Sequence, residues 1–178
     1  MPSTRTRKTL GFAATAAFAL LLGGARDEGG SARVTNFEER LLATHNEERA
    51  KLGLAPLRWN ADLAKGARRW ATSLSTSGRF EHSPNGDVLL GENIWGGTPR
   101  AFAPEDMVEL WIAEKRDFMP GIFPANSRTG RAADVSHYTQ VVWKDTHEVG
   151  CGLSHAGKEE ILVCRYSQPG NIVGRRAF

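Results

Sequence analysis

Cysteine is scarce in this chain, and several familiar catalytic signatures are missing. There are two cysteines in 178 residues, so at most one intramolecular disulfide can form. The sequence contains no G-x-S-x-G elbow, no H-E-x-x-H helix motif, no Walker loop and no dinucleotide fingerprint. These absences argue against the common serine hydrolase, zincin protease and nucleotide-binding classes.

Acidic residues are absent from the first 25 positions, and this changes the meaning of the net charge of +3. Three of the 23 basic residues fall there; without them, 20 basic residues face 20 acidic ones. Bulk charge therefore gives no support for a nucleic-acid partner. A basic start, an uncharged apolar run from Leu10 to Leu22 and small residues up to Ala25 are typical of a secretory signal peptide over residues 1–25.

No apolar run in the chain has the length of a membrane span. The run from Leu10 to Leu22 falls short of the about 18 residues that a spanning helix needs. We therefore expect export, to the periplasm or beyond the cell, with no transmembrane segment in the mature chain. Residues 26–34 are glycine-rich and polar and indicate a flexible linker. The rest is long enough for one core-forming domain, placed at 35–172, with a tail at 173–178 and a monomeric state.

Apolar residues recur at helical spacing in three segments of the first two-thirds of the chain. Each has capping signals: Thr35 or Asn36 and Gly53 for the first, Asn60 and Gly78 for the second, and Pro104 at the start of the third. His45 lies on the inner face of the first helix. A lone histidine there is more often a packed core residue than a ligand, and we interpret it so.

The C-terminal third has the alternation and β-branched residues typical of strands, at 137–143, 148–154 and 160–166. A hairpin of the last two, centred on Gly157 and Lys158, would place Cys151 directly opposite Cys164. In an exported protein this position predicts a disulfide.

Four ionisable residues stand out from separate segments: His82, Glu92, Glu114 and His137. Imidazoles bind Zn²⁺, and carboxylates can add a ligand, act as a base or orient a histidine ring. Spacing alone does not join these four into a site. Glu114 has a simpler interpretation, since at a helix end it can pair with Lys115 or Arg116 in solvent.

Several motifs occur in a fixed order along the chain, and together they carry a resemblance. They are His45-Asn46-Glu47-Glu48-Arg49, Pro56-Leu57-Arg58-Trp59-Asn60, Gly91-Glu92-Asn93, Trp111-Ile112-Ala113-Glu114, His137-Tyr138-Thr139-Gln140-Val141-Val142-Trp143 and Cys164-Arg165-Tyr166 with Pro169-Gly170-Asn171. In these motifs the sequence resembles the CAP superfamily, also called SCP domains, which includes cysteine-rich secretory proteins, antigen 5 and pathogenesis-related 1 proteins. Its single cysteine pair suits a bacterial-type secreted member.

The resemblance implies an α+β fold, an α-β-α sandwich around a mainly antiparallel sheet. It also implies a central cleft formed by His82, Glu92, Glu114 and His137, with a divalent metal ion such as zinc on the two histidines. Ser136 stands where glycine is common in the family, and Gln168 replaces a proline.

Three functions are compatible with the resemblance. The first is a secreted protein whose cleft binds a divalent ion or small polar ligand without catalysis. The second is a metal-dependent protease with Glu92 or Glu114 as the base. The third is a sterol- or lipid-binding module using the apolar loop 118–123. A small ligand, a lipid and a protein all remain possible partners.

Overall fold

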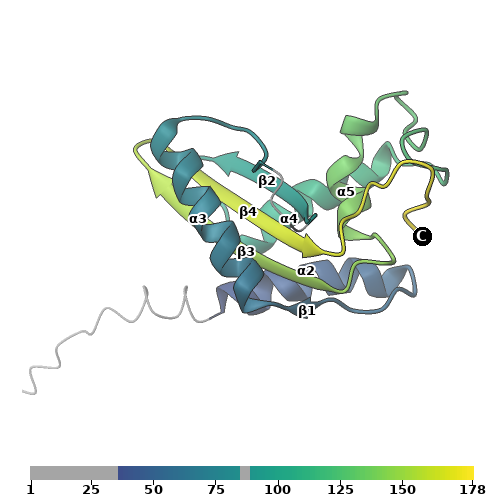
Figure 1. Cartoon of the computed structure of the whole chain (residues 1–178), viewed down its shortest axis with the longest axis horizontal. Helices are drawn as coiled ribbons and strands as arrows, with labels where there is room; N and C mark the ends of the chain where they lie inside the picture. Colours follow the sequence, from purple (N-terminus) through teal and green to yellow (C-terminus); the bar gives the residue numbers. More distant parts are fainter. Residues whose placement is uncertain (1–35, 85–88) are drawn as a thin grey trace, which may run out of the picture.

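The fold is a sheet with helices on both faces, seen in a computed structural model that describes residues 36–84 and 89–178 (Figure 1). The expected signal peptide and linker lie outside the described residues. The elements, in chain order, are α2 (Phe37–Lys51), β1 (Arg58–Trp59), α3 (Ala61–Ser77), β2 (Gly91–Gly97), α4 (Pro104–Ala113), η1 (Glu114–Arg116), η2 (Ala132–Asp134), α5 (Ser136–Val141), β3 (Glu148–Ala156) and β4 (Glu159–Ser167). This architecture is the predicted α-β-α sandwich.

The sheet has the strand order β1-β3-β4-β2, so β2 lies at one edge. β2 and β3 are both antiparallel to β4, and the short β1 runs parallel to β3. In the β3–β4 hairpin Cys151 pairs with Cys164, and the two form a disulfide. The predicted hairpin, its register and its bridge are all confirmed.

Two glycines of β3 allow α3 to lie directly on the sheet. A side chain at Gly150 would clash with the backbone of Asn60 and Ala64, and one at Gly152 with the backbone of Arg68. Small residues therefore line both sides of this contact, since Ala67 and Ala71 on α3 are fully buried. At the ends of α3, the Asn60 side chain accepts the predicted N-cap bonds and Gly78 adopts the left-handed conformation (φ 68°).

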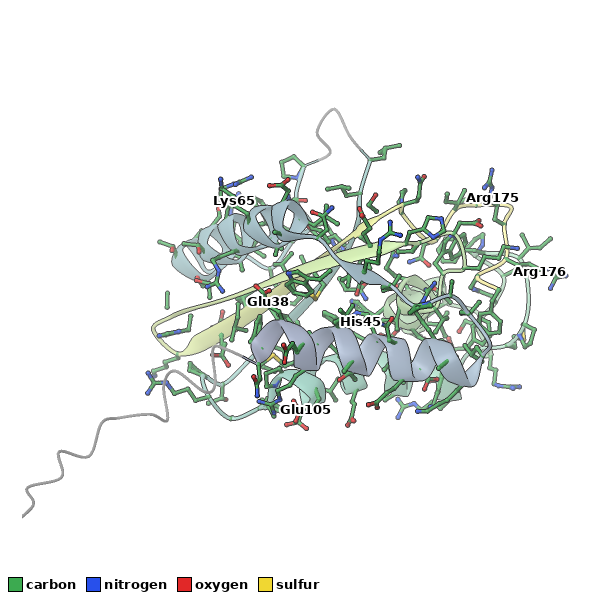
Figure 2. All side chains as sticks on the ribbon, turned by 90° about the horizontal axis from the view of Figure 1, so that it is seen from below. Glu38, His45, Lys65, Glu105, Arg175 and Arg176 are labelled. Carbon is green, nitrogen blue, oxygen red and sulfur yellow. A yellow bond between two sulfur atoms is a disulfide. The ribbon has the colours of Figure 1, made fainter. Side chains whose placement is uncertain are left out.

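Helices α2 and α4 pack against each other on the opposite face of the sheet, as Figure 2 shows for α2. His45 on α2 points inward and is fully buried. Its Nδ1 donates to the Leu41 carbonyl (2.7 Å), and its Nε2 accepts from the Tyr166 hydroxyl (2.8 Å). The prediction that His45 is a packed core residue is confirmed. Asn36 begins α2, but its side chain makes no capping bond.

The strand predicted at 137–143 is wrong, because Ser136–Val141 forms the short helix α5. Six residues are too few for a helix to be stable by itself in water. The Glu114 carboxylate caps its start: Oε2 accepts from the backbone N–H groups of His137 (3.0 Å) and Tyr138 (3.1 Å). A side chain from a distant segment thus does what an N-cap residue does locally.

The other end of α5 is held by Arg49, a fully buried residue of α2. Its guanidinium donates to the carbonyls of Val141 (3.0 Å), Trp143 (2.9 Å) and Thr146 (3.1 Å). A cation at these carbonyls also complements the negative end of the helix dipole. Burial lowers the pKa of Arg49 to about 10, so it stays protonated at neutral pH. Charged residues from distant parts of the chain therefore stabilise both ends of α5. Their hydrogen bonds override the strand preference of residues 137–143.

Candidate functional site

The first half of the site is a pair formed by His82, after α3, and Glu92, on β2. The Nδ1 of His82 donates to Glu92 Oε1 at 3.0 Å. The side chain of Glu92 is only 7% exposed, whereas that of His82 is 65% exposed. The imidazole is therefore presented to solvent by a buried carboxylate.

Glu92 receives four hydrogen bonds, which use both of its oxygens. Besides His82, Oε1 accepts from the Ser83 N–H (2.8 Å), while Oε2 accepts from the Ser83 hydroxyl (2.7 Å) and from Arg165 Nε (3.2 Å). Burial opposes the charged form of Glu92, but the bonds from His82 and Ser83 and the charge of Arg165 outweigh it and lower its pKa. The same bond to Glu92 raises the pKa of His82.

The second half of the site is a pair formed by Glu114, at the end of α4, and His137, in the first turn of α5. The Nδ1 of His137 donates to Glu114 Oε1 at 2.6 Å. The indole of Trp111 stacks on the His137 ring, with centroids 6.1 Å apart and an interplanar angle of 13°. Glu114 thus caps α5 and orients His137 at the same time.

The prediction that Glu114 pairs with Lys115 or Arg116 in solvent is wrong, because Glu114 binds His137 and both cations have other partners. Lys115 pairs with Glu48, and Arg116 pairs with Asp117.

The two pairs share one chemical feature, which is a histidine whose Nδ1–H is bound by a carboxylate. This bond fixes the tautomer and leaves Nε2 as an unprotonated lone pair when the ring is neutral. Neither His82 nor His137 uses Nε2 in a hydrogen bond to another part of the described chain. Each is therefore prepared to act as a ligand through Nε2.

Consecutive residues of β2 connect the two pairs. Asn93, next to Glu92, is buried, and its Nδ2 donates to the His137 carbonyl (3.1 Å) and to the Tyr166 hydroxyl (3.3 Å). Since Tyr166 in turn donates to His45, a buried chain of hydrogen bonds runs from α2 to the first turn of α5. This chain fixes the backbone that carries His137 relative to the sheet.

The structure joins the four predicted residues as two separate pairs, His82 with Glu92 and His137 with Glu114. Within the two described ranges, no group of three or more His, Cys, Asp or Glu side chains is placed to hold a metal ion. As ligands, the residues present offer two imidazole nitrogens, with the carboxylates behind them. Imidazole nitrogen is a zinc ligand, but two of them are fewer than the three or four protein ligands usual in zinc sites.

Sequence reasoning missed the role of Arg165 and Ser83 in holding Glu92, and of Trp111 against His137. Arg165 pairs with Glu92 in the register of β2 and β4. The sequence alone does not give this register, because 61 residues (98–158) separate β2 from β4 and the two strands pair only in the folded sheet.

A groove of about 250 Å³ lies elsewhere, between α2 and α4. Its lining includes Glu48 and Lys115 but none of His82, Glu92, Glu114 and His137. Its lysines are already paired, since Lys51 and Lys115 both bind Glu48, so we place the site at the histidine–carboxylate pairs.

The loop 118–123 turns its aromatic side chains inward. Phe118 packs edge-on against Tyr138, and both Phe118 and Phe123 lie against the core. Met119 and Ile122 are its exposed apolar residues, at 38% and 49% exposure. An apolar surface on this loop therefore has only those two large side chains.

The fold and the paired histidines define a class of protein: a disulfide-bonded α-β-α domain in which carboxylates orient two imidazoles. A family model described as "CAP: Cysteine-rich secretory protein family" matches residues 42–166. The chain belongs to this family.

Among curated proteins, the chain is similar to plant pathogenesis-related proteins. It is 32% identical over 145 residues to "Pathogenesis-related protein PR-1 type" of Sambucus nigra, covering 80% of this chain and 83% of that protein. It is 31% identical over 150 residues to "Pathogenesis-related protein 1C" of Nicotiana tabacum, covering 83% and 84%. Each alignment covers about four-fifths of this chain.

Among solved structures, the fold is similar to that in the "Crystal structure of NaASP2 with Zn2+". The TM-score is 0.66 at 22% identity, with 88% of each chain covered. A similar match to Na-ASP-1 has a TM-score of 0.66 at 22% identity and covers 80% of this chain and 41% of that one. At these identities the matches show the fold alone.

The disulfide fits a protein of an oxidising compartment. Within residues 36–84 and 89–178, none of the helices has the length and apolar character to cross a membrane.

Proposed function

We propose that this chain is a secreted CAP-family protein whose His82 and His137 bind a divalent metal ion or a small polar ligand without turnover. The observation that carries this proposal is the pairing of each histidine with its own carboxylate. Metal-binding histidines commonly donate their second ring nitrogen to a carboxylate in this way. Such partners set the tautomer and increase the basicity of the ligand nitrogen.

Zinc is the ion we propose to test first. Neutral imidazole is a good ligand for it, and Nε2 of both histidines is available. A crystal structure of the fold neighbour NaASP2 contains Zn2+. With two protein ligands and water for the rest, we expect a weaker site than those with three or four protein ligands.

Binding is favoured over hydrolysis because the carboxylates are already occupied. A general base must accept a proton from water or substrate, but both Glu92 oxygens are used by four donors. Glu114 is bound by two backbone amides and by His137. Glu92 and Glu114 therefore serve to orient the imidazoles of His82 and His137.

Calorimetric titration of the purified protein with zinc tests the proposal. We expect saturable binding, weakened about tenfold or more in His82→Ala and in His137→Ala, because each removes one of two ligands. His155→Ala is the matched control, since His155 is exposed on β3, and it should bind as the unaltered protein does. Equal affinity in all three variants, or no binding by the parent, would contradict the proposal.

The protease alternative has its own measurement. Cleavage of a peptide library by the zinc-loaded protein, lost in Glu114→Gln, would show turnover. The absence of cleavage together with zinc binding is what we expect.

A further inference from the structure

Helix α3 carries basic side chains that have no part in the proposed function. Helix α3 carries Lys65, Arg68 and Arg69 but a single acidic residue, Asp62, two turns before Arg69. In Figure 2 Lys65 lies on the exposed side of α3, away from the sheet. None of the three cations has a carboxylate partner within the part of the chain that the structure describes.

Arg69 of α3 and Arg165 of β4 converge over Gly66. A Cβ on Gly66 would lie 2.9 Å from one terminal guanidinium nitrogen of Arg165 and 3.8 Å from one of Arg69. Two like charges therefore lie near one another above a residue that has no side chain. Glu92 offsets the charge of Arg165, and a further anion beside both guanidinium groups would reduce the repulsion that remains.

The donors of both guanidinium groups are largely unused. Arg165 spends Nε on Glu92, and its terminal nitrogens make no hydrogen bond to any described residue. Arg69 makes none to the described chain either. Glu92 cannot serve both arginines, because its two oxygens already accept four bonds.

Arg165 is fixed while Arg69 is exposed, so the pair has one preorganised and one mobile member. The Arg165 side chain is 18% exposed and is anchored through Glu92, whose own side chain is 7% exposed. Planar guanidinium forks match the oxygens of phosphate-type anions, and in the described part of the chain the terminal nitrogens of both arginines are free to donate to them.

We propose that Arg69 and Arg165, converging over Gly66 beside the His82–Glu92 pair, form a binding site for a doubly charged oxyanion of the phosphate type. The anion is free phosphate or the phosphate group of an ester. The site does not need a metal ion, so its test is independent of zinc binding.

Calorimetry with inorganic phosphate, at constant ionic strength and with EDTA present, tests the site. We expect saturable binding by the parent protein and a loss of about tenfold or more in Arg69→Gln, which removes charge-assisted hydrogen bonds. Arg68→Gln is the matched control: the same charge is removed from the next residue, whose guanidinium is directed at the Leu153 carbonyl (3.0 Å). Its phosphate affinity should change by less than about twofold.

Gly66→Ala separates the geometry from the charge. The added Cβ would displace the Arg165 guanidinium and weaken phosphate binding, while circular dichroism should show that α3 is retained, because alanine favours a helix over glycine. Unchanged phosphate affinity in Gly66→Ala would overturn the convergence over Gly66.

Other probes distinguish the sources of the anion. Phosphoserine binding more tightly than inorganic phosphate would assign the site to phosphate esters, and the reverse to free phosphate. Acetate binding as tightly as phosphate, an equal loss in Arg68→Gln and Arg69→Gln, or no saturable phosphate binding by the parent protein would each overturn the proposal.

Discussion

The β3–β4 hairpin and helix α5 are built on opposite principles. The hairpin is specified locally, by alternation along two neighbouring strands, a turn at Gly157 and a disulfide between paired residues. Helix α5 is specified from a distance, since Glu114 caps its start and Arg49 holds its end. The hairpin forms the centre of the sheet, whereas α5 carries His137.

The difference shows how the site is kept in place. One histidine is oriented by a carboxylate on β2, which is paired along its length with β4. The other is oriented by a carboxylate that also maintains the helix beneath it. Disturbing the remote caps should therefore affect the His137 half of the site before it affects the His82 half.

The largest effect is expected from Arg49→Met, which removes the cap at the end of α5. The carbonyls of Ala55, Val141, Trp143 and Thr146 would lose a buried charged donor. The free energy of unfolding in urea should fall by about 3–5 kcal/mol. Arg40→Met is the control on the same helix; it removes a partly exposed pair with Glu105 and should cost less than about 1 kcal/mol. Equal losses would mean that α5 does not depend on Arg49.

Removing the disulfide by the double change Cys151→Ala and Cys164→Ala should come next. The bridge closes a loop with a sequence separation of 13, and we expect a loss of about 3 kcal/mol in the free energy of unfolding. Amide exchange at His137 and Tyr138 should be unchanged relative to global stability. Faster amide exchange in α5 than the loss of global stability explains would show that α5 depends on the hairpin.

The pH dependence of stability should be governed in part by His45. Burial lowers its pKa in the folded protein to about 4 from 6.5. Between these two pH values His45 is protonated in the unfolded chain but neutral in the folded protein. Stability is thus present above the unfolded pKa and is lost as the pH falls towards 4. Between about pH 7 and about pH 5, the loss should be about 2 kcal/mol.

His82 has a raised folded pKa and contributes with the opposite sign: its stabilisation is present at low pH and is lost as the pH rises. Comparing the parent protein with His45→Gln isolates the contribution of His45 to the pH dependence of stability, because His82 is present in both proteins. The unfolding free energy of His45→Gln should vary less with acidification over this range. An identical slope in both proteins would refute the assignment.

The smallest and most local effect is expected from Glu114→Ala. Two amides in the first turn of α5 would lose their acceptor, at a cost of about 1–2 kcal/mol. Amide hydrogen exchange followed by NMR should show faster exchange at His137 and Tyr138 and no change in the β3–β4 hairpin. Glu92→Gln is the matched control, since Glu92 contacts neither amide.

Much of the fold was predictable because its signals are local. The ends of α3 at Asn60 and Gly78, the start of α4 at Pro104 and the pairing of Cys151 with Cys164 each follow from residues next to the feature they determine. Helix α5 was not predictable, because Glu114 lies 23 residues and Arg49 lies 92 residues from the groups they bind. The identities of the four site residues followed from the family resemblance, but their division into two pairs required the structure.

The most direct test of the central claim is the tautomer of the two site histidines. Long-range ¹H–¹⁵N NMR above the histidine pKa should show His82 and His137 protonated at Nδ1, with Nε2 free, and exposed His147 and His155 serve as internal references. On addition of zinc, the Nε2 signals of both site histidines should shift together. Protonation of either histidine at Nε2, or a zinc response confined to His147 and His155, would contradict the account.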